Sequence, residues 1–548
     1  MAISRPREWR LRSSVLAALT ALTALTARPA DAQLPDPYVV PRGALRVSFR
    51  PSYTNWDLLF DSDGNQVALG RFFSADTLGA PFLPTLAAAE LAVRSITGDG
   101  SYRMNAGAFR ADQDGDVRRF PFEFSLGLSS RLTLSATIPI VTTRVNSATV
   151  LDTAGANVGW NQVTGPAANL GARADVMLLL GDLETAVMTL EAEMAAGSFG
   201  CPASTQCDQA RAVADRAREL AANLTLMTGV AQTSGGDVVF PPFAPLAGSP
   251  EGAAILGAIS SMNADLQALG QASLTGSLPL PATPTDAGAV NTIITGSEFG
   301  YQARTLDPEK SAKLSRFGDI ELGLRYALAQ GPHMRAVLGA RARLPTGFRD
   351  LTNDYLDIGP GDRQLDLEWS FDAAFEPGRR MGIWLGASYT LQLGDRLVRR
   401  VSPPERPLAE AATELLVDRN LGEILRASIH PLLRLNDQFR IFVSAAYVHK
   451  ARDRFSANGA PVPELEALTE IETWSFGAGL WYRMESGRRS ARLPIEAGIS
   501  YRSAFSGNGG RAPKANRISM SLRLYYRLWG GMPERETPEA EQQAQERQ

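Results

Sequence analysis

The sequence predicts an antiparallel transmembrane β-barrel of about fourteen strands that carries a large α-helical insertion. Three observations support this. Segments of about ten residues alternate apolar with polar or very small side chains, which gives a strand one apolar and one wet face. The chain starts with a secretion signal, and no later apolar run is long enough for a membrane-spanning helix. Only helices and closed barrels satisfy their backbone hydrogen bonds in lipid, so the repeated alternation indicates a barrel.

Composition excludes several classes of protein. The chain has 548 residues, 44% hydrophobic residues and a formal net charge of −3. These values exclude a disordered chain and a strongly nucleic-acid-binding one, so no nucleic-acid partner is expected. A soluble all-β protein remains an alternative, but it would bury its apolar faces in a core and would not need so many aromatic residues on them.

The N-terminus predicts secretion through a cleaved signal peptide. Four arginines precede an apolar run over residues 15–27, and Ala30-Asp31-Ala32 has the small-x-small form that signal peptidase accepts. We expect residues 1–32 to be the signal peptide. No cysteine lies there to hold a lipid anchor. The predicted location is the bacterial outer membrane, with its lipids as the surrounding partner.

The alternating segments divide into two parts of one barrel. The first part is predicted over 33–145, with a short helix at Pro84–Thr97 in the lumen or at the periplasmic rim, and the remainder over 317–529. An even number of strands puts both chain ends in the periplasm, which is the main reason for including the weak segment 66–72. Residues 530–548 are predicted to be a disordered tail. The predicted strands are 44–60, 66–72, 102–111, 118–128, 131–145, 318–328, 334–344, 364–375, 381–392, 423–434, 438–449, 472–484, 492–502 and 517–529.

Residues 146–316 predict a helical loop insertion. Apolar residues recur at helical spacing over 176–194 and again over 213–227, which predicts an antiparallel helix pair. The link contains the only two cysteines, Cys201 and Cys207. In an oxidising compartment they most simply form a disulfide, although free thiols or a metal site with further ligands stay open. A third helix is expected to start at Ser249.

Charged residues on the inward faces are candidates for the lumen and its constriction. Both signs occur, and the arginines of one strand stand close to the acids of the next. This favours ion pairs that hold a plugged or narrow barrel together. The alternative is a charge-selective filter, which would be expected to show a ring of one sign. The lumen candidates are Arg325, Arg341, Arg343, Asp366, Glu368, Asp372 and Arg523.

Catalytic and metal-binding motifs are weak. Residues 61–65 (DSDGN) and 112–116 (DQDGD) resemble calcium loops, but their glycine stands fourth where the EF-hand needs it sixth, so both are predicted to be turns. His333, His430 and His449 have no serine and acid partners at motif spacing. We therefore expect no enzyme activity, no cofactor and no metal site.

Three stretches of the sequence carry a family resemblance. Residues 317–326 (FGDIELGLRY), 342–347 (ARLPTG) and 357–362 (DIGPGD) resemble the outer-membrane proteins labelled as putative phenol meta-degradation-pathway transporters, a family similar to the fatty-acid and toluene transporters. The resemblance covers the barrel and not the insertion. It implies a fourteen-stranded barrel that passes small hydrophobic molecules, with lumen-filling segments in place of an open water channel.

The expected function is an outer-membrane channel or transporter for small hydrophobic compounds, aromatic or fatty-acid-like. The insertion would capture the solute, and the Pro84–Thr97 helix with the strand of Arg341 and Arg343 would form the constriction. The alternative is a structural or adhesive barrel whose insertion binds a partner that the sequence does not identify. Contact of Val176, Leu183 and Leu220 with the lumen would favour transport, whereas an outward, exposed apolar stripe would favour adhesion. A general porin is disfavoured because it needs a wide, water-filled lumen.

Overall fold

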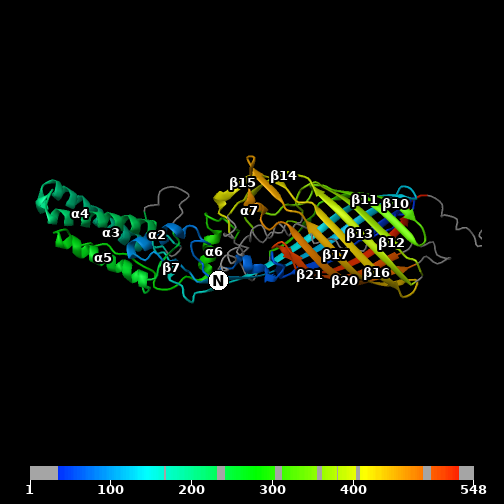
Figure 1. Cartoon of the computed structure of the whole chain (residues 1–548), viewed down its shortest axis with the longest axis horizontal. Helices are drawn as coiled ribbons and strands as arrows, with labels where there is room; N and C mark the ends of the chain where they lie inside the picture. Colours follow the sequence, from blue (N-terminus) through cyan, green and yellow to red (C-terminus); the bar gives the residue numbers. More distant parts are fainter. Residues whose placement is uncertain are drawn as a thin grey trace, which may run out of the picture.

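The protein is elongated, with a β-barrel at one end and a helical bundle at the other (Figure 1). The computed structural model describes residues 35–165, 168–230, 241–302, 312–354, 359, 361–378, 380–402, 408–484 and 495–529. The predicted signal peptide and the predicted C-terminal tail lie outside the described residues.

Twelve antiparallel strands form a closed ring, because the first strand pairs with the last. Closure leaves no open sheet edge in the ring, as a barrel in lipid requires. In ring order the strands are β1 (Ala44–Phe49), β5 (Ala108–Gly127), β6 (Leu132–Asp152), β10 (Glu321–Gln330), β11 (Met334–Arg343), β12 (Asp366–Phe375), β13 (Met381–Gln392), β16 (Ile424–Arg434), β17 (Phe439–Lys450), β20 (Ile471–Met484), β21 (Ile495–Asn508) and β23 (Asn516–Arg527).

Two further segments lengthen strands of the ring. β2 (Ser52–Trp56) continues β1 in the same register against the same neighbours, β5 and β23. The break between β1 and β2 includes Pro51, which has no N–H to donate to the ladder. β9 (Ala312–Phe317) continues β10 along β6, with a register shift of one residue between them.

The predicted count of fourteen strands is wrong by two. The segment 66–72 does not enter the barrel: β4 (Gln66–Ala68) pairs only with β3 (Leu58–Phe60), and a 3-10 helix, η1 (Leu69–Phe73), follows it. The small sheet is completed by β22 (Ala512–Pro513). An antiparallel β-hairpin this small, with one short added strand, has too little hydrogen bonding to cross a membrane, which needs about 9–11 residues per strand.

The second difference in the strand count arises at residues 112–116. They were predicted to be a turn between two strands, but they form no turn, so the two strands are one. Residues 112–116 continue straight along β5, with Asp112 opposite Ala148 and Asp116 opposite Arg144 on β6. The glycine in this stretch, Gly115, lies so close to the ring of Trp56 that a Cβ would come within 2.8 Å of it. Because the count falls by two, the number of strands stays even. The start of the first strand and the end of the last strand therefore still lie at the same rim.

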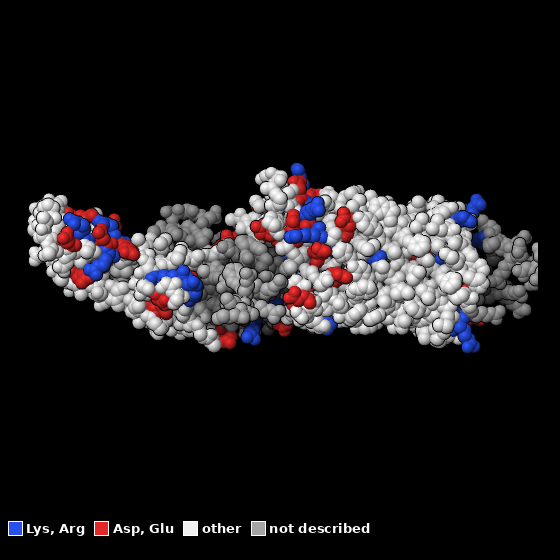
Figure 2. Space-filling model, viewed as in Figure 1, with Lys and Arg blue, Asp and Glu red and all other residues white. Residues whose placement is uncertain are grey.

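The apolar rows predicted to face outward do so. On β23 the alternate residues Ile518, Met520 and Tyr526 are 43%, 53% and 50% exposed, while Arg517 and Arg523 between them are buried. Charged side chains are sparse over the barrel wall and gather on the helices and near the two ends of the barrel (Figure 2). The aliphatic and aromatic rows therefore form an exposed apolar surface on the outside of the barrel and do not pack against one another across the interior.

The two ends of the barrel differ. At one end, the short-turn rim, tight turns join β5 to β6, β10 to β11, β12 to β13 and β16 to β17, and β1 begins beside the end of β23. At the other end, the long-loop rim, β6, β11, β13 and β17 end in long connections. β5 and β6 have 20 and 21 residues, about twice a membrane crossing. Their excess length forms a ribbon beyond the long-loop rim that leads to the helices (Figure 1).

The helical bundle, which we call the helical head, contains α2 (Leu86–Thr97), α3 (Leu170–Ala195), α4 (Thr205–Thr228) and α5 (Pro250–Ala268). α3 and α4 form an antiparallel pair closed by the Cys201–Cys207 disulfide, which confirms that prediction. As expected, α5 starts at Ser249, whose hydroxyl accepts the Gly252 N–H. None of the helices in the described part of the chain combines the length and the apolar character needed for a membrane crossing.

The position predicted for the Pro84–Thr97 helix is wrong. α2 packs against α4 and α5 in the helical head, where the Ser95 hydroxyl contacts both Glu219 and Asn223 of α4. The error follows from the miscounted strands. Since segment 66–72 does not cross the membrane, the chain stays at the long-loop rim after β2 and enters the head from there.

Candidate functional site

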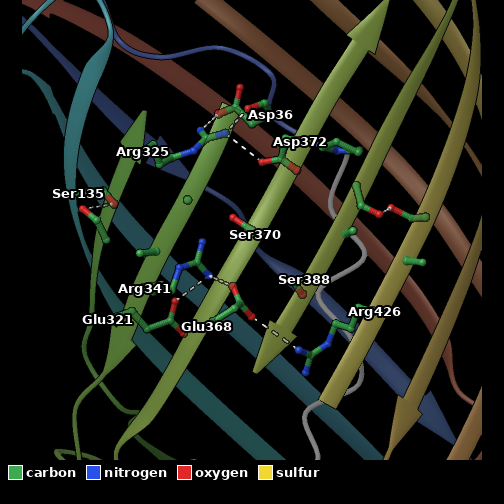
Figure 3. A pocket seen from close by; sticks show the side chains of 18 of the residues that line it. Asp36, Ser135, Glu321, Arg325, Arg341, Glu368, Ser370, Asp372, Ser388 and Arg426 are labelled. Atoms are coloured by element: carbon green, nitrogen blue, oxygen red, sulfur yellow. Dashed lines mark hydrogen bonds and ion pairs between the residues drawn. The ribbon is translucent and has the colours of Figure 1, made fainter. Parts of the chain in front are cut away.

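A cavity of about 170 Å³ lies inside the barrel (Figure 3). Its wall is formed by residues of β5, β6, β10 to β13, β16, β17 and β21, together with Pro35, Asp36 and Arg50. Five of the predicted lumen residues line it. They are Arg325, Arg341, Arg343, Glu368 and Asp372.

Ion pairs cross from strand to strand along one wall of this cavity. Arg341 on β11 lies 3.2 Å from Glu321 on β10 and 3.7 Å from Glu368 on β12. Arg343, two residues further along β11, lies 2.5 Å from Asp366. Because strand residues with the same parity share a face, this alternation of sign between neighbouring strands neutralises the wall. The described lumen therefore has no ring of one sign.

A single buried carboxylate gathers arginines from three strands. Asp36, which precedes β1, lies 2.7 Å from Arg46 of β1, 2.9 Å from Arg325 of β10 and 3.5 Å from Arg523 of β23. Asp372 on β12 also pairs with Arg325, at 3.0 Å. Asp36 is 8% exposed, so this cluster sits inside the lumen. Arg523 contacts it from outside the main cavity, beside a second cavity of about 40 Å³.

The described part of the N-terminal segment lies inside the barrel. The ring of Tyr38 lies edge-on to Trp384 with centroids 6.0 Å apart, and the guanidinium groups of Arg335 and Arg483 lie 5.0 and 5.8 Å from the Tyr38 centroid. The Val40 N–H donates to the hydroxyl of Thr133 on β6. Residues 35–40 thus fill the lumen on the side of the short-turn rim.

Sequence reasoning missed Asp36 and Tyr38 because they lie in a proline-rich stretch without strand periodicity. For Asp36, the inward arginines Arg46, Arg325 and Arg523 gave a signal, because a buried arginine in a barrel needs an acid.

An aromatic layer adjoins the charged region. Trp384, Phe442 and Trp481 point inward from β13, β17 and β20 and are 4–7% exposed. Neighbouring glycines make room for two of these rings, since a Cβ on Gly479 would come within 2.3 Å of Phe442 and one on Gly498 within 2.5 Å of Trp481. The lumen here is filled by side chains that offer apolar faces.

The loop between β11 and β12 turns around one buried acid. Asp319, fully buried just before β10, accepts the Gly347 N–H at 2.7 Å and the Asp362 N–H at 3.3 Å. A Cβ on Gly361 would come within 2.7 Å of the same carboxylate. Asp319, Gly347 and Asp362 come from the three stretches that carry the family resemblance. In this protein those stretches therefore share a structural role at the long-loop rim.

Further ion pairs fasten this loop to β14 (Asp395–Arg400) and β15 (Glu414–Asn420), a hairpin that rises from the long-loop rim. Asp350 pairs with Arg399 at 2.8 Å, and Arg349 pairs with Asp395 at 2.5 Å. Asp395 also accepts from Arg419 at 2.8 Å. The loop and the hairpin thus form one cross-linked structure at the mouth of the barrel.

A second contact joins this hairpin to the chain leading from α6 (Ala287–Thr295). Arg400 donates to the Phe299 carbonyl and lies 4.8 Å from the Tyr301 centroid. Glu298 lies here beside Glu410, and its backbone carbonyl accepts the Ala411 N–H. Burial, and secondarily the charge of Glu410, raise the pKa of Glu298 from 4.5 to about 7.

The raised pKa of Glu298 predicts a pH-sensitive contact. The contact between residues 296–302 and the β14–β15 hairpin favours the protonated form of Glu298. The stabilisation of this contact is therefore complete below about pH 4.5 and is lost as the pH rises through about 7. We expect faster amide exchange in residues 296–302 at pH 8 than at pH 6 after correction for intrinsic rates. Glu298→Gln should remove this difference, and Glu410→Gln should reduce it only in part. Equal exchange at both pH values in the unmodified protein would contradict the prediction.

No group of three or more His, Cys, Asp and Glu side chains in the described residues could hold a metal ion. The stretch 61–65 is a turn, as predicted, in which the Asp61 carboxylate accepts the N–H groups of Asp63 and Asn65. His430 is buried in the aromatic layer, and neither of its ring nitrogens has a hydrogen-bond partner.

Comparisons with known proteins find similarity only in structure. No protein-family model matches the chain, and no curated protein matches it in sequence. An outer-membrane channel of Pseudomonas putida F1 superposes with a TM-score of 0.39 at 8% identity, over 91% of this chain and 99% of that one. The toluene transporter TodX of Pseudomonas putida gives 0.27 at 10% identity, over 89% and 90% of the two chains. A FadL homologue of Pseudomonas aeruginosa gives 0.25 at 8%, again over 89% and 90%. Because both identities and superpositions are low, the functional inferences below rest on this chain's own geometry.

Proposed function

We propose that the protein is an outer-membrane channel for small hydrophobic compounds, aromatic or fatty-acid-like. The observation that carries the proposal is a closed barrel with an apolar outer surface, whose lumen holds a small cavity and, next to it, an aromatic layer. Charged and small side chains line the cavity itself, and the adjoining aromatic layer supplies the apolar faces on which apolar ligands bind. Burial of an apolar solute contributes about 25 cal/mol per Å², so weak and reversible binding there is feasible.

In this proposal the long-loop rim and the helical head face the outside of the cell, and the short-turn rim faces the periplasm. A solute enters past the loop between β11 and β12 and reaches the cavity. Its exit is blocked by residues 35–40, so transfer requires these residues to move away from Arg46, Arg325 and Arg523. The constriction therefore consists of this segment and the ion-paired wall. It does not include α2, which lies in the helical head.

The charged wall argues against a general porin. A porin needs a wide aqueous lumen, whereas the cavity here has a volume of about 170 Å³ and side chains fill the rest of the bore near the short-turn rim. We expect single channels of the purified protein in planar bilayers to have a much lower conductance than an open porin.

The proposal is tested by uptake into cells whose intact lipopolysaccharide excludes apolar solutes. Cells that express the protein should accumulate radiolabelled toluene or phenol faster than cells with an empty vector, while arabinose uptake should be unchanged. Equal uptake of the aromatic compounds in both strains would reject the function, and faster uptake of arabinose alone would indicate a polar channel.

A second candidate function is an adhesive barrel, and the position of the head favours it. Val176, Leu183 and Leu220 face neither the lumen nor solvent but form the core of the helical head, which projects away from the barrel. The outer side of α3 exposes large apolar residues, among them Met177 and Met188, which are 56% and 57% exposed, beside the exposed Glu184. Such a surface suits contact with a partner.

Deletion of residues 170–275 separates the two functions. If the head captures solutes, the deletion should lower uptake of apolar compounds relative to a small sugar. Unchanged selectivity would contradict a capturing role and support the head as a separate binding module. Heat-modifiable migration of the deleted protein on gels should verify that the barrel still folds.

A further inference from the structure

We infer that the cavity accepts the carboxylate of a small apolar acid, with Arg502 as the binding group. This inference rests on the proposed channel function and names its substrate class. Its basis is an imbalance between the walls of the cavity. Each other arginine that lines it lies within 4.0 Å of an acid, whereas Arg502 on β21 forms no ion pair with a described residue.

The hydrogen bonding of Arg502 is incomplete. Its Nη2 makes one long contact, 3.4 Å, with the hydroxyl of Ser444, and its buried Nη1 has no partner. A buried guanidinium nitrogen without a partner keeps an uncompensated desolvation penalty, so a bound acceptor would lower the free energy of the site. Arginine offers two parallel N–H donors, which fit a carboxylate better than other anions of one charge.

The surroundings of Arg502 favour a negative ligand. Arg517 stands directly opposite it on β23, and like charges in this position repel one another. Two arginines therefore stand side by side here, in contrast to the alternating charges of Arg341 and Glu368 on the opposite part of the wall.

The apolar part of the ligand is suggested by the neighbouring wall. Ala446 and Val448 point inward from β17 and line the same cavity as Arg502. A ligand held by its carboxylate at Arg502 can place a ring against these two side chains. The class that fits is an aromatic monocarboxylate, for which benzoate is the probe.

The test measures ion permeability in planar bilayers. Reversal potentials in gradients of sodium benzoate, acetate and chloride should show benzoate as the most permeant anion. Arg502→Gln should lower the permeability of benzoate relative to acetate about tenfold, and Arg502→Lys should lower it less. Arg396→Gln, which changes an exposed arginine paired with Asp418 on the outer hairpin, is the matched control and should change nothing.

Several outcomes overturn the inference. Equal permeability ratios in the unmodified protein and Arg502→Gln would reject Arg502 as the site, and equal permeation of acetate and benzoate would reject the apolar part. If a variant fails to insert in bilayers, calorimetric titration of the detergent-solubilised unmodified protein must show saturable benzoate binding. Uptake of toluene without any Arg502-dependent benzoate effect would leave the channel in place and reject only the inference.

Discussion

Replacement of Asp36 by asparagine is expected to destabilise the barrel by about 3 kcal/mol and to open its lumen. The change removes one carboxylate that Arg46, Arg325 and Arg523 share at 2.7–3.5 Å. Loss of one partner of a buried ion pair costs about 3–5 kcal/mol because the other charge stays buried. We expect the lower end of this range because each arginine keeps one further acid. These acids are Glu123, Asp372 and Glu496.

The same substitution should change conduction. Without Asp36, residues 35–40 lose their anchor to the strands, and three arginines become less neutralised. We therefore expect a higher single-channel conductance and a shift of the reversal potential toward anion selectivity. Urea unfolding in lipid measures the stability, and bilayer recording measures both electrical effects.

Asp418→Asn provides the control, because its partner Arg396 is 72% exposed and surface ion pairs contribute about 0–1 kcal/mol. If Asp36→Asn unfolds at the same urea concentration as the unmodified protein and conducts identically, residues 35–40 do not close the lumen. Increased conductance without loss of stability would mean that Asp36 holds the segment but does not support the wall.

The barrel could be predicted because its physical cause is local in sequence. Alternation of side chains between lipid and lumen repeats every two residues along each strand, as on β23, where Met520 and Arg523 are assigned to opposite faces correctly. Strand ends were less predictable. Residues 112–116 have the composition of a turn, but pairing with β6 on one side and the Trp56 ring on the other keep them extended.

The candidate site was only partly predictable, for a different reason. Arg341 and Glu368 could be identified because both stand on strands whose faces the alternation assigns. Asp36 and Tyr38 act through contacts with strands that are far away in sequence, and nothing in their own stretch requires such contacts. The position predicted for α2 was wrong for a related reason, since the misassigned strand 66–72 moves the next connections to the opposite rim until the second misassignment, at residues 112–116, restores them.

The second large effect is expected at Asp319, where substitution by alanine should release the loop between β11 and β12. The carboxylate accepts the N–H groups of Gly347 and Asp362 at 2.7 and 3.3 Å while fully buried. Hydrogen bonds to a charged group contribute about 1.5–3 kcal/mol each, so we expect the loop to lose about 3 kcal/mol. Asp319→Asn should cost less, since an amide keeps one acceptor oxygen.

Limited proteolysis can measure this loss, because opening of the loop exposes Arg349 to trypsin. In the closed loop the Arg349 side chain is held by Asp395, at 2.5 Å, and by the Asp362 carbonyl, at 3.2 Å. Where opening is fast relative to cleavage, the rate follows the open population. A loss of about 3 kcal/mol then corresponds to about 100-fold faster cleavage after Arg349.

Glycine variants test the same geometry from the other side of the carboxylate. A Cβ on Gly361 would lie 2.7 Å from Asp319 Oδ2, so Gly361→Ala should strain the loop by about 1–3 kcal/mol. Gly378→Ala is the matched control, because no atom lies within 4 Å of its Cβ position. Two results together would contradict this geometry: trypsin cleaves the Gly361→Ala variant no faster than the Gly378→Ala variant, and Arg349 stays protected in Asp319→Ala. The ion pairs with β14 and β15 alone would then hold the loop between β11 and β12. The three stretches would meet at Asp319 without stabilising this loop.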